Sequence, residues 1–120
     1  MKSRIAVGVL FLVALVALAP CADAASNVLT WTDNSTNETN FHIERKAEAC
    51  TGPALFVEIA TVGINVATFT DTAVQEGVTY CYRVAASNLA GKSAYSNTAS
   101  RTVPVTIPSA PTNLIAVPGP

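Results

Sequence analysis

The stretch VTYCYRVAASN (residues 78–88) decides the fold class of this 120-residue chain. Its large side chains Tyr80, Tyr82 and Val84 alternate with Cys81 and Arg83. A repeat of two is typical of a β-strand that turns one face toward a core and the other toward solvent. Aromatic and β-branched residues, which favour strands, make up much of the stretch. The sequence therefore predicts a half-buried strand here.

Similar patterns recur at short intervals on both sides of this strand. They are NVLTWT (27–32), FHIERK (41–46), LFVEIATV (55–62), ATFTDT (67–72) and the more polar SAYSNTASRTV (93–103). Segments rich in Asn, Gly, Pro and Ser separate them, as turns require. No segment after residue 24 sustains a 3.6-residue apolar repeat, so we expect no substantial helix. Short strands at regular spacing predict an all-β sandwich or barrel.

The first 24 residues have the features of a secretory signal peptide. Lys2 and Arg4 precede an uninterrupted apolar run of 15 residues (5–19), and Ala22-Asp23-Ala24 provides a small-x-small cleavage site. The run is shorter than the roughly 20 residues that a membrane-spanning helix needs. We therefore expect cleavage after Ala24 and export of the rest.

Two alternatives to cleavage after Ala24 remain. The apolar run is retained as a signal anchor in the first. In the second, Cys21 carries a lipid, but Pro20 directly before it disfavours that modification. With cleavage, we expect a secreted, periplasmic or cell-surface protein without membrane insertion.

Residues 25–120 are enough for one small domain and too few for two. They hold five basic and seven acidic side chains, a net charge near −2, with no basic cluster. Nucleic acids and anionic membrane surfaces are bound through such clusters, so neither is an expected partner.

Two cysteines, Cys50 and Cys81, remain after cleavage. Exported chains meet oxidising conditions, in which paired thiols usually form a disulfide. The spacing is unlike the C-x-x-C of redox motifs, so we favour a structural bond over thiol exchange chemistry. With His42 as the sole histidine, a zinc site is not expected, and no other metal or cofactor is indicated.

Residues 27–103 resemble a fibronectin type III domain. The resemblance is carried by Trp31, the spacing from Val74 to Tyr80, and YCYRVAASNLAGKSAYS (80–96), and it is closest to exported bacterial members with SAYSN near the last strand. It implies an immunoglobulin-like sandwich of two sheets over residues 25–104, and a tyrosine corner at Tyr80. The core that the resemblance implies consists of Trp31, Ile43, Phe69, Tyr82 and Val84.

The resemblance also implies a position for the two cysteines. In that fold, the strands 41–46 and 78–88 are antiparallel neighbours, so the end of the first lies beside the start of the second. Cys50 follows the first strand and Cys81 stands near the start of the second. We therefore expect these two thiols to meet.

One element of the family is missing from the front of the domain. Its members begin with a strand written like PSAPTNLTA, whereas here the strand 27–32 follows almost directly after the predicted cleavage site. A segment of that kind, PSAPTNLIAV (108–117), stands at the C-terminal end instead. Residues 105–120 are then a linker and the start of a further domain, or they fill the vacant place in their own sandwich or in a neighbouring molecule. We expect a monomer, or weak self-association through the edge of strand 27–32 or through residues 109–118.

Catalysis is not expected. His42 points outward by alternation, with no nucleophile motif near it, and Glu44 and Glu58 are expected to be solvated charges on neighbouring strands. Binding is the better prospect, because the loops 33–40 and 88–92 gather at one end of such a sandwich. Their possible ligand residues are Asn34, Asn37, Asn40, Asn88 and Lys92, and the alternative is a pair of solvated turns.

The sequence thus favours a non-catalytic extracellular interaction or spacer module that contacts an extracellular protein or polysaccharide. A carbohydrate-binding accessory module that uses the two loops is one alternative. A strand-donating self-assembly unit is the other.

Overall fold

The structure is a computed structural model that describes residues 24–120, so the predicted signal peptide, apart from Ala24, lies outside the described residues. The described chain forms seven strands. They are β1 (Asn27–Thr30), β2 (Asn40–Lys46), β3 (Val57–Gly63), β4 (Thr68–Asp71), β5 (Thr79–Asn88), β6 (Gly91–Lys92) and β7 (Ala99–Thr102). Within residues 24–120, no helix is long and apolar enough to span a membrane.

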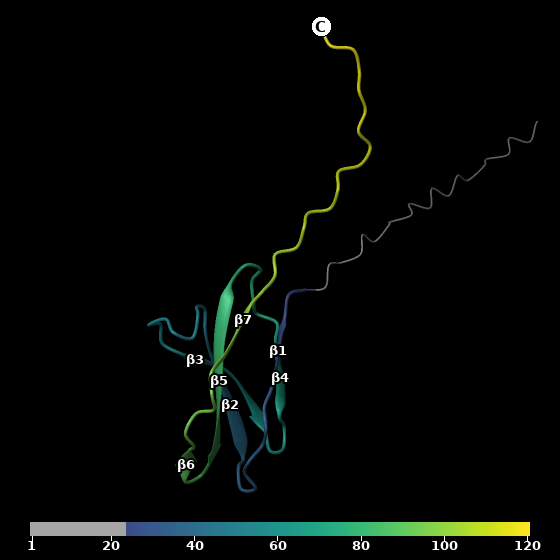
Figure 1. Ribbon diagram of the computed structural model, residues 1–120. Helices are drawn as coiled ribbons and strands as arrows, with labels where there is room; N and C mark the ends of the chain where they lie inside the picture. The colour runs from purple at the N-terminus through teal and green to yellow at the C-terminus, as the bar shows by residue number, and fades with distance from the viewer. Residues whose placement is uncertain (1–23) are drawn as a thin grey trace, which may run out of the picture.

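The strands form two sheets that face each other (Figure 1). One sheet contains β1 and β4, and the other has the order β3-β2-β5, with β6 and β7 both paired to β5. Every strand pair is antiparallel. The alternating pattern predicted an all-β sandwich or barrel, and the resemblance implied a sandwich of two sheets; the two-sheet sandwich is confirmed.

The core lies between the sheets and is built on alternate residues of β2 and β5. Its buried members are Phe41, Ile43, Tyr80, Tyr82, Val84 and Val103. Trp31 and Phe69, also expected in the core, pack against this cluster but are only partly buried. Trp31 lies against Phe41 with ring centroids 5.7 Å apart.

The polar segment 93–103 differs from the expected single strand, because β7 is its only regular strand and the short β6 ends just before it. Between them, Ser93 and Ser96 attach the chain to β5 through paired bonds. The Ser93 N–H donates to the Ala86 carbonyl (2.7 Å), and the Ala86 N–H donates to Ser93 Oγ (2.9 Å). Ser96 repeats this with Val84, at 2.7 and 3.0 Å. The serine hydroxyls therefore replace backbone carbonyls along β5.

The disulfide between Cys50 and Cys81 joins the loop after β2 to β5, as expected. The Cα atoms are 5.1 Å apart, and Cys81 is fully buried. Lys46, opposite Cys81 in the sheet, donates from Nζ to the carbonyls of Cys50 (3.0 Å) and Gly52 (2.6 Å). The buried ammonium is thus satisfied by the loop that the disulfide closes.

Tyr80 forms the expected tyrosine corner, since its hydroxyl accepts a bond of 2.9 Å from the Gln75 N–H. The tail after Val103 is irregular and extended, and it leaves the sandwich at the end where β1 begins (Figure 1). Near its base, the Thr106 hydroxyl donates to Glu76 (2.9 Å). Its apolar side chains Ile107, Leu114 and Ile115 are at least 80% exposed.

Candidate functional site

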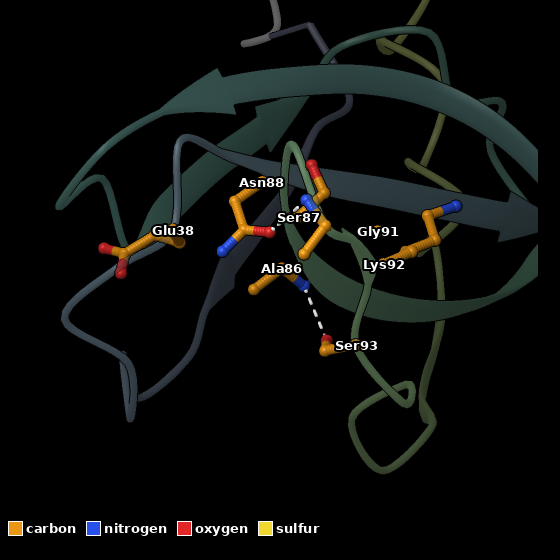
Figure 2. A pocket seen from close by; sticks show the side chains of 8 residues that line it. Glu38, Ala86, Ser87, Asn88, Gly91, Lys92 and Ser93 are labelled. Atoms are coloured by element: carbon orange, nitrogen blue, oxygen red, sulfur yellow. Dashed lines mark hydrogen bonds between the residues drawn. The ribbon is translucent and has the colours of Figure 1, made fainter.

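The two loops that were expected to gather at one end do meet. Asn88 Nδ2 donates to the Asn37 carbonyl (3.1 Å), and the Thr39 N–H donates to the Ser87 carbonyl (2.8 Å). A cavity of about 300 Å³ lies beside this junction (Figure 2). Its lining residues are Glu38, Ala86, Ser87, Asn88, Ala90, Gly91, Lys92 and Ser93.

The five proposed ligand residues are only partly brought together. Asn88 and Lys92 line this cavity, whereas Asn37 and Asn40 are exposed and outside its lining. Asn34 lines two other cavities, next to Trp31. Lys92 is also engaged by Glu44, with its Nζ 3.3 Å from the carboxylate. The cavity thus offers one amide and one ammonium from the predicted set.

Glu38 is a structural residue of the first loop, buried at its base. It accepts a bond of 2.7 Å from the Ser35 hydroxyl. This bond lowers the pKa of the Glu38 carboxyl, and a longer one from the Asn65 N–H (3.4 Å) acts in the same direction. Asp33 also accepts from Ser35, so the loop satisfies much of its own polarity.

The outer face of β2 and β5 carries a stacked arrangement around Arg83. Its guanidinium lies 4.2 Å from the centroid of the Phe56 ring and 3.6 Å from that of Tyr95. It donates two bonds to Glu44, at 2.8 and 3.1 Å. Burial opposes ionisation of Glu44, but the bonds from Arg83, Tyr95 and Lys92 outweigh it and lower the pKa of the carboxyl.

Glu44 and Glu58 were expected to be solvated charges, and that is wrong for Glu44. The two stand opposite each other in the β2–β3 register, but Glu44 is buried under the Arg83 stack. The period-2 pattern assigned the correct face. It gave no information on the Phe56 and Tyr95 side chains, which come from irregular segments and cover that face.

A second hydrogen-bonded row on this face was not anticipated. Glu58 contacts His42 Nδ1 at 2.5 Å, and His42 Nε2 lies 2.7 Å from Ser87 Oγ. The three residues come from β3, β2 and β5, and only the strand register brings them together. The row therefore connects β3, β2 and β5 across the sheet through side-chain contacts.

The side of the sandwich beside β1 is open. Among residues 24–120, no strand pairs with β1 on the edge away from β4. Three adjacent cavities lie there between β1 and the segment 93–101. The middle cavity shares Leu29 and Ala99 with the cavity on one side, and Trp31 and Ser96 with the cavity on the other. The largest measures about 550 Å³. We call this row of cavities the side groove.

Two buried polar atoms at the side groove have no hydrogen-bond partner within the described part of the chain. They are Asn27 Oδ1 and Trp31 Nε1. Buried polar groups are nearly always paired with protein or with ordered water, and the described residues supply no partner for these two atoms. The other end of the Asn27 amide is satisfied, since Nδ2 donates to the Tyr82 hydroxyl (2.8 Å).

No group of three or more His, Cys, Asp or Glu side chains within residues 24–120 is arranged to hold a metal ion. The expected absence of a metal site stays a prediction for the whole chain.

Comparison with solved structures supports the fibronectin type III fold. The sixth fibronectin type III domain of the human fibronectin type III domain containing protein 3 is 19% identical, with a TM-score of 0.55 over 75% of this chain and 83% of that one. A myokine structure is 21% identical, with a TM-score of 0.51 over 68% and 85%. No family model and no curated protein matches the sequence.

A third similar structure is the twitchin kinase region of C. elegans, which includes a fibronectin type III domain. It is 24% identical, with a TM-score of 0.54, and the match covers 68% of this chain but 14% of that much longer one. At these identities the likeness defines the fold. The chain therefore has the fibronectin type III fold.

Proposed function

We propose that this chain is a non-catalytic interaction or spacer module that works outside the cytoplasm, in a secreted, periplasmic or cell-surface protein. The observation that carries this proposal is the disulfide between Cys50 and Cys81, set in a sandwich of the fibronectin type III fold. Disulfides persist in oxidising compartments, and the N-terminal sequence predicts export to one. An extracellular protein or a polysaccharide is the proposed partner.

The internal bonding suits a spacer. On the larger sheet, charged and polar side chains have partners within the chain. Arg83 bonds Glu44, His42 contacts Glu58 and Ser87, and Lys46 donates to the loop that the disulfide closes. A surface of this kind resists bending and keeps its polar groups engaged. Contacts with a partner are then expected at the loops and at the side groove.

The compartment is tested by expressing the full chain with its N-terminal sequence in a bacterium that has an oxidising periplasm. We expect the chain outside the cytoplasm, with residues 1–24 removed and no free thiol at Cys50 or Cys81, as measured by intact mass after alkylation. A chain that stays in the cytoplasm with both thiols free would refute the proposal.

A second candidate function is carbohydrate binding at the loop cavity, and the observation that favours it is the polar lining shown in Figure 2. Asn88 and Lys92 provide hydrogen-bond donors of the kind that sugar hydroxyls accept. Calorimetry with a panel of soluble polysaccharides should give binding that Asn88→Ala abolishes. Asn34→Ala, outside this cavity, is the matched control and should leave binding intact. Equal loss in both variants, or no binding by the parent chain, would exclude the cavity as a sugar site.

A further inference from the structure

We propose that the tail segment Leu114–Val117 of one copy pairs as a β-strand with β1 of a second copy and fills its side groove. The interaction goes beyond the module function and does not depend on it. It would make each chain both a donor and an acceptor of a strand.

The acceptor is the free edge of β1. Antiparallel pairing with β4 uses one edge of residues 27–30, and the described chain supplies no strand to the other. Free strand edges present rows of unpaired N–H and C=O groups that readily take up another chain. Below this edge, Leu29, Trp31 and Val84 line the largest cavity of the side groove, so an incoming strand would also meet apolar surface.

The unpaired polar atoms add a second, independent observation. Asn27 Oδ1 and Trp31 Nε1 are buried at the groove without partners in the described structure. A neighbouring strand carries N–H and C=O groups along its length. Because the chain itself covers both atoms, an entering strand would pair with them only as the residues that line the groove shift to admit it.

The donor has matching chemistry and length. Leu114–Val117 is a run of four apolar residues, and β1 also has four residues. Leu114, Ile115 and Val117 are between 76% and 94% exposed, although such side chains gain from burial. Residues 104–120 carry no charged side chain, so their burial requires no charge to lose its hydration.

Direction favours a second copy over the chain's own tail. Arg101 Nη1 lies 3.4 Å from the Ser26 carbonyl, so β7 ends where β1 begins, and the tail departs from that end (Figure 1). A strand antiparallel to β1, like every other pair in this fold, must run toward that end. The chain's own tail would first have to reverse to the opposite end. The tail of a second copy arrives there already in the required direction.

The prolines of the tail also favour an extended donor. Pro104, Pro108 and Pro111 each restrict the preceding residue to extended conformations, and proline-rich segments act as semi-rigid spacers. Such a segment reaches outward more readily than it folds back. Because the donor and acceptor surfaces differ, the contact is head-to-tail and produces linear chains unless it closes into a ring.

The test is light scattering of the oxidised full chain over a range of concentrations, together with thermal melting. Ile115→Asp changes the pairing segment. Ile107→Asp is the matched control, because it places the same charge at another largely exposed tail position (92%, against 80% for Ile115) outside that segment. We expect the mass of the parent chain to rise to two or more copies as concentration increases, Ile107→Asp to behave likewise, and Ile115→Asp to stay monomeric.

Three results would overturn the proposal. One is a parent chain that stays monomeric and melts like Ile115→Asp, which would leave the tail without a role in this sandwich. Another is a monomeric parent that melts above Ile115→Asp at every concentration, which would assign the groove to the chain's own tail. The third is assembly that persists in Ile115→Asp, which would place the contact on another surface.

Discussion

At the scale of single residues, two buried tyrosine hydroxyls connect the sheets and the turns. Tyr80 accepts from the Gln75 N–H in the turn before β5. Tyr82 donates to Asp71 Oδ2 and accepts from Asn27 Nδ2, both at 2.8 Å, and so links β5 to β1 and β4. Arg45 Nη1 completes this network at 2.8 Å from Asp71.

Removal of the Tyr80 hydroxyl should destabilise the fold without changing its shape. Tyr80→Phe leaves the Gln75 N–H without its partner, and an unsatisfied part-buried donor costs about 1 to 2 kcal/mol of unfolding free energy. Urea denaturation of the variant and the parent chain measures the difference. Thr70→Val, which removes a hydroxyl from an exposed position of β4, serves as comparison and should cost less. Equal effects of the two substitutions would contradict the role of the corner.

Tyr82 predicts an alkaline limit to stability. Burial, reinforced by the nearby Asp71 carboxylate, raises the pKa of Tyr82 to about 12 from its usual 10.0. Because folding raises this pKa, the stabilisation is complete below pH 10 and is lost as the pH rises toward 12. The ultraviolet absorbance of tyrosinate should show one component near 12 that Tyr82→Phe removes. A titration in which all tyrosines ionise near 10 in the folded protein would contradict this assignment.

Residue roles followed from the sequence where a backbone rule governs them. The roles of Tyr80, Cys50 and Cys81 were implied by the resemblance to fibronectin type III domains, whose strand order and tyrosine corner fix these positions. The role of Glu44 was not implied, because Phe56 and Tyr95 reach it from irregular segments whose course no periodicity specifies. His42, Glu58 and Ser87 each lie on outward positions of predicted strands, and pairing those strands in register would have revealed the row.

At the scale of elements, the segment 93–98 is held to β5 by two serines. Each serine makes two hydrogen bonds with one residue of β5, Ser93 with Ala86 and Ser96 with Val84. In each pair the serine N–H donates to the β5 carbonyl, and the serine hydroxyl accepts from the β5 N–H. The chain departs from a regular strand here, and Tyr95 between the serines lies over Arg83. The SAYS sequence is therefore explained by hydrogen bonding and by the Arg83 stack.

Substitution of one of these serines should weaken that attachment. Ser96→Ala leaves the Val84 N–H unpaired and is expected to cost about 1 to 2 kcal/mol of unfolding free energy. Ser100→Ala in β7, where backbone pairing alone makes the attachment, should change stability by less than about 0.5 kcal/mol. Chemical denaturation of both variants decides the matter. A Ser96→Ala protein as stable as Ser100→Ala would show that the hydroxyl bond is dispensable.

The elements were largely predictable because alternation marks a strand with one buried face. The strands β1 to β5 appeared within a few residues of their expected ranges. The break between β6 and β7 was not predicted, because a serine hydroxyl and a backbone carbonyl offer the same acceptor and the pattern does not distinguish them. Trp31 was expected to be in the core, and it stays partly open because the edge beside it is uncovered.

At the scale of the whole molecule, the disulfide should contribute a large part of the stability. Closing a loop between residues 31 apart stabilises a fold by about 3 to 4 kcal/mol through the entropy of the unfolded chain. Reduction should lower the unfolding free energy of the parent chain by that amount. The Cys50→Ser, Cys81→Ser double variant should have a lower unfolding free energy than the oxidised parent chain, and addition of reductant should not change it. A parent chain whose stability is unchanged by complete reduction would contradict this expectation.

The open side is the feature that most affects how the whole molecule behaves. On the larger sheet, the Arg83 stack, its ion pair with Glu44 and the disulfide engage the outer face of β2 and β5. The two-stranded sheet, in contrast, leaves β1 with an uncovered edge over the side groove. The apolar tail extends into solvent from the end at which β1 begins (Figure 1). The proposed pairing with the tail of a second copy would cover that edge.

The most direct measurement is amide hydrogen exchange of Val28 and Leu29 in β1, followed by nuclear magnetic resonance at several protein concentrations. Pairing between copies predicts that protection of at least one of these amides grows with concentration, and that Ile115→Asp removes the growth while Ile107→Asp does not. Exchange rates that stay the same at every concentration, in the parent chain as in both variants, would contradict the claim.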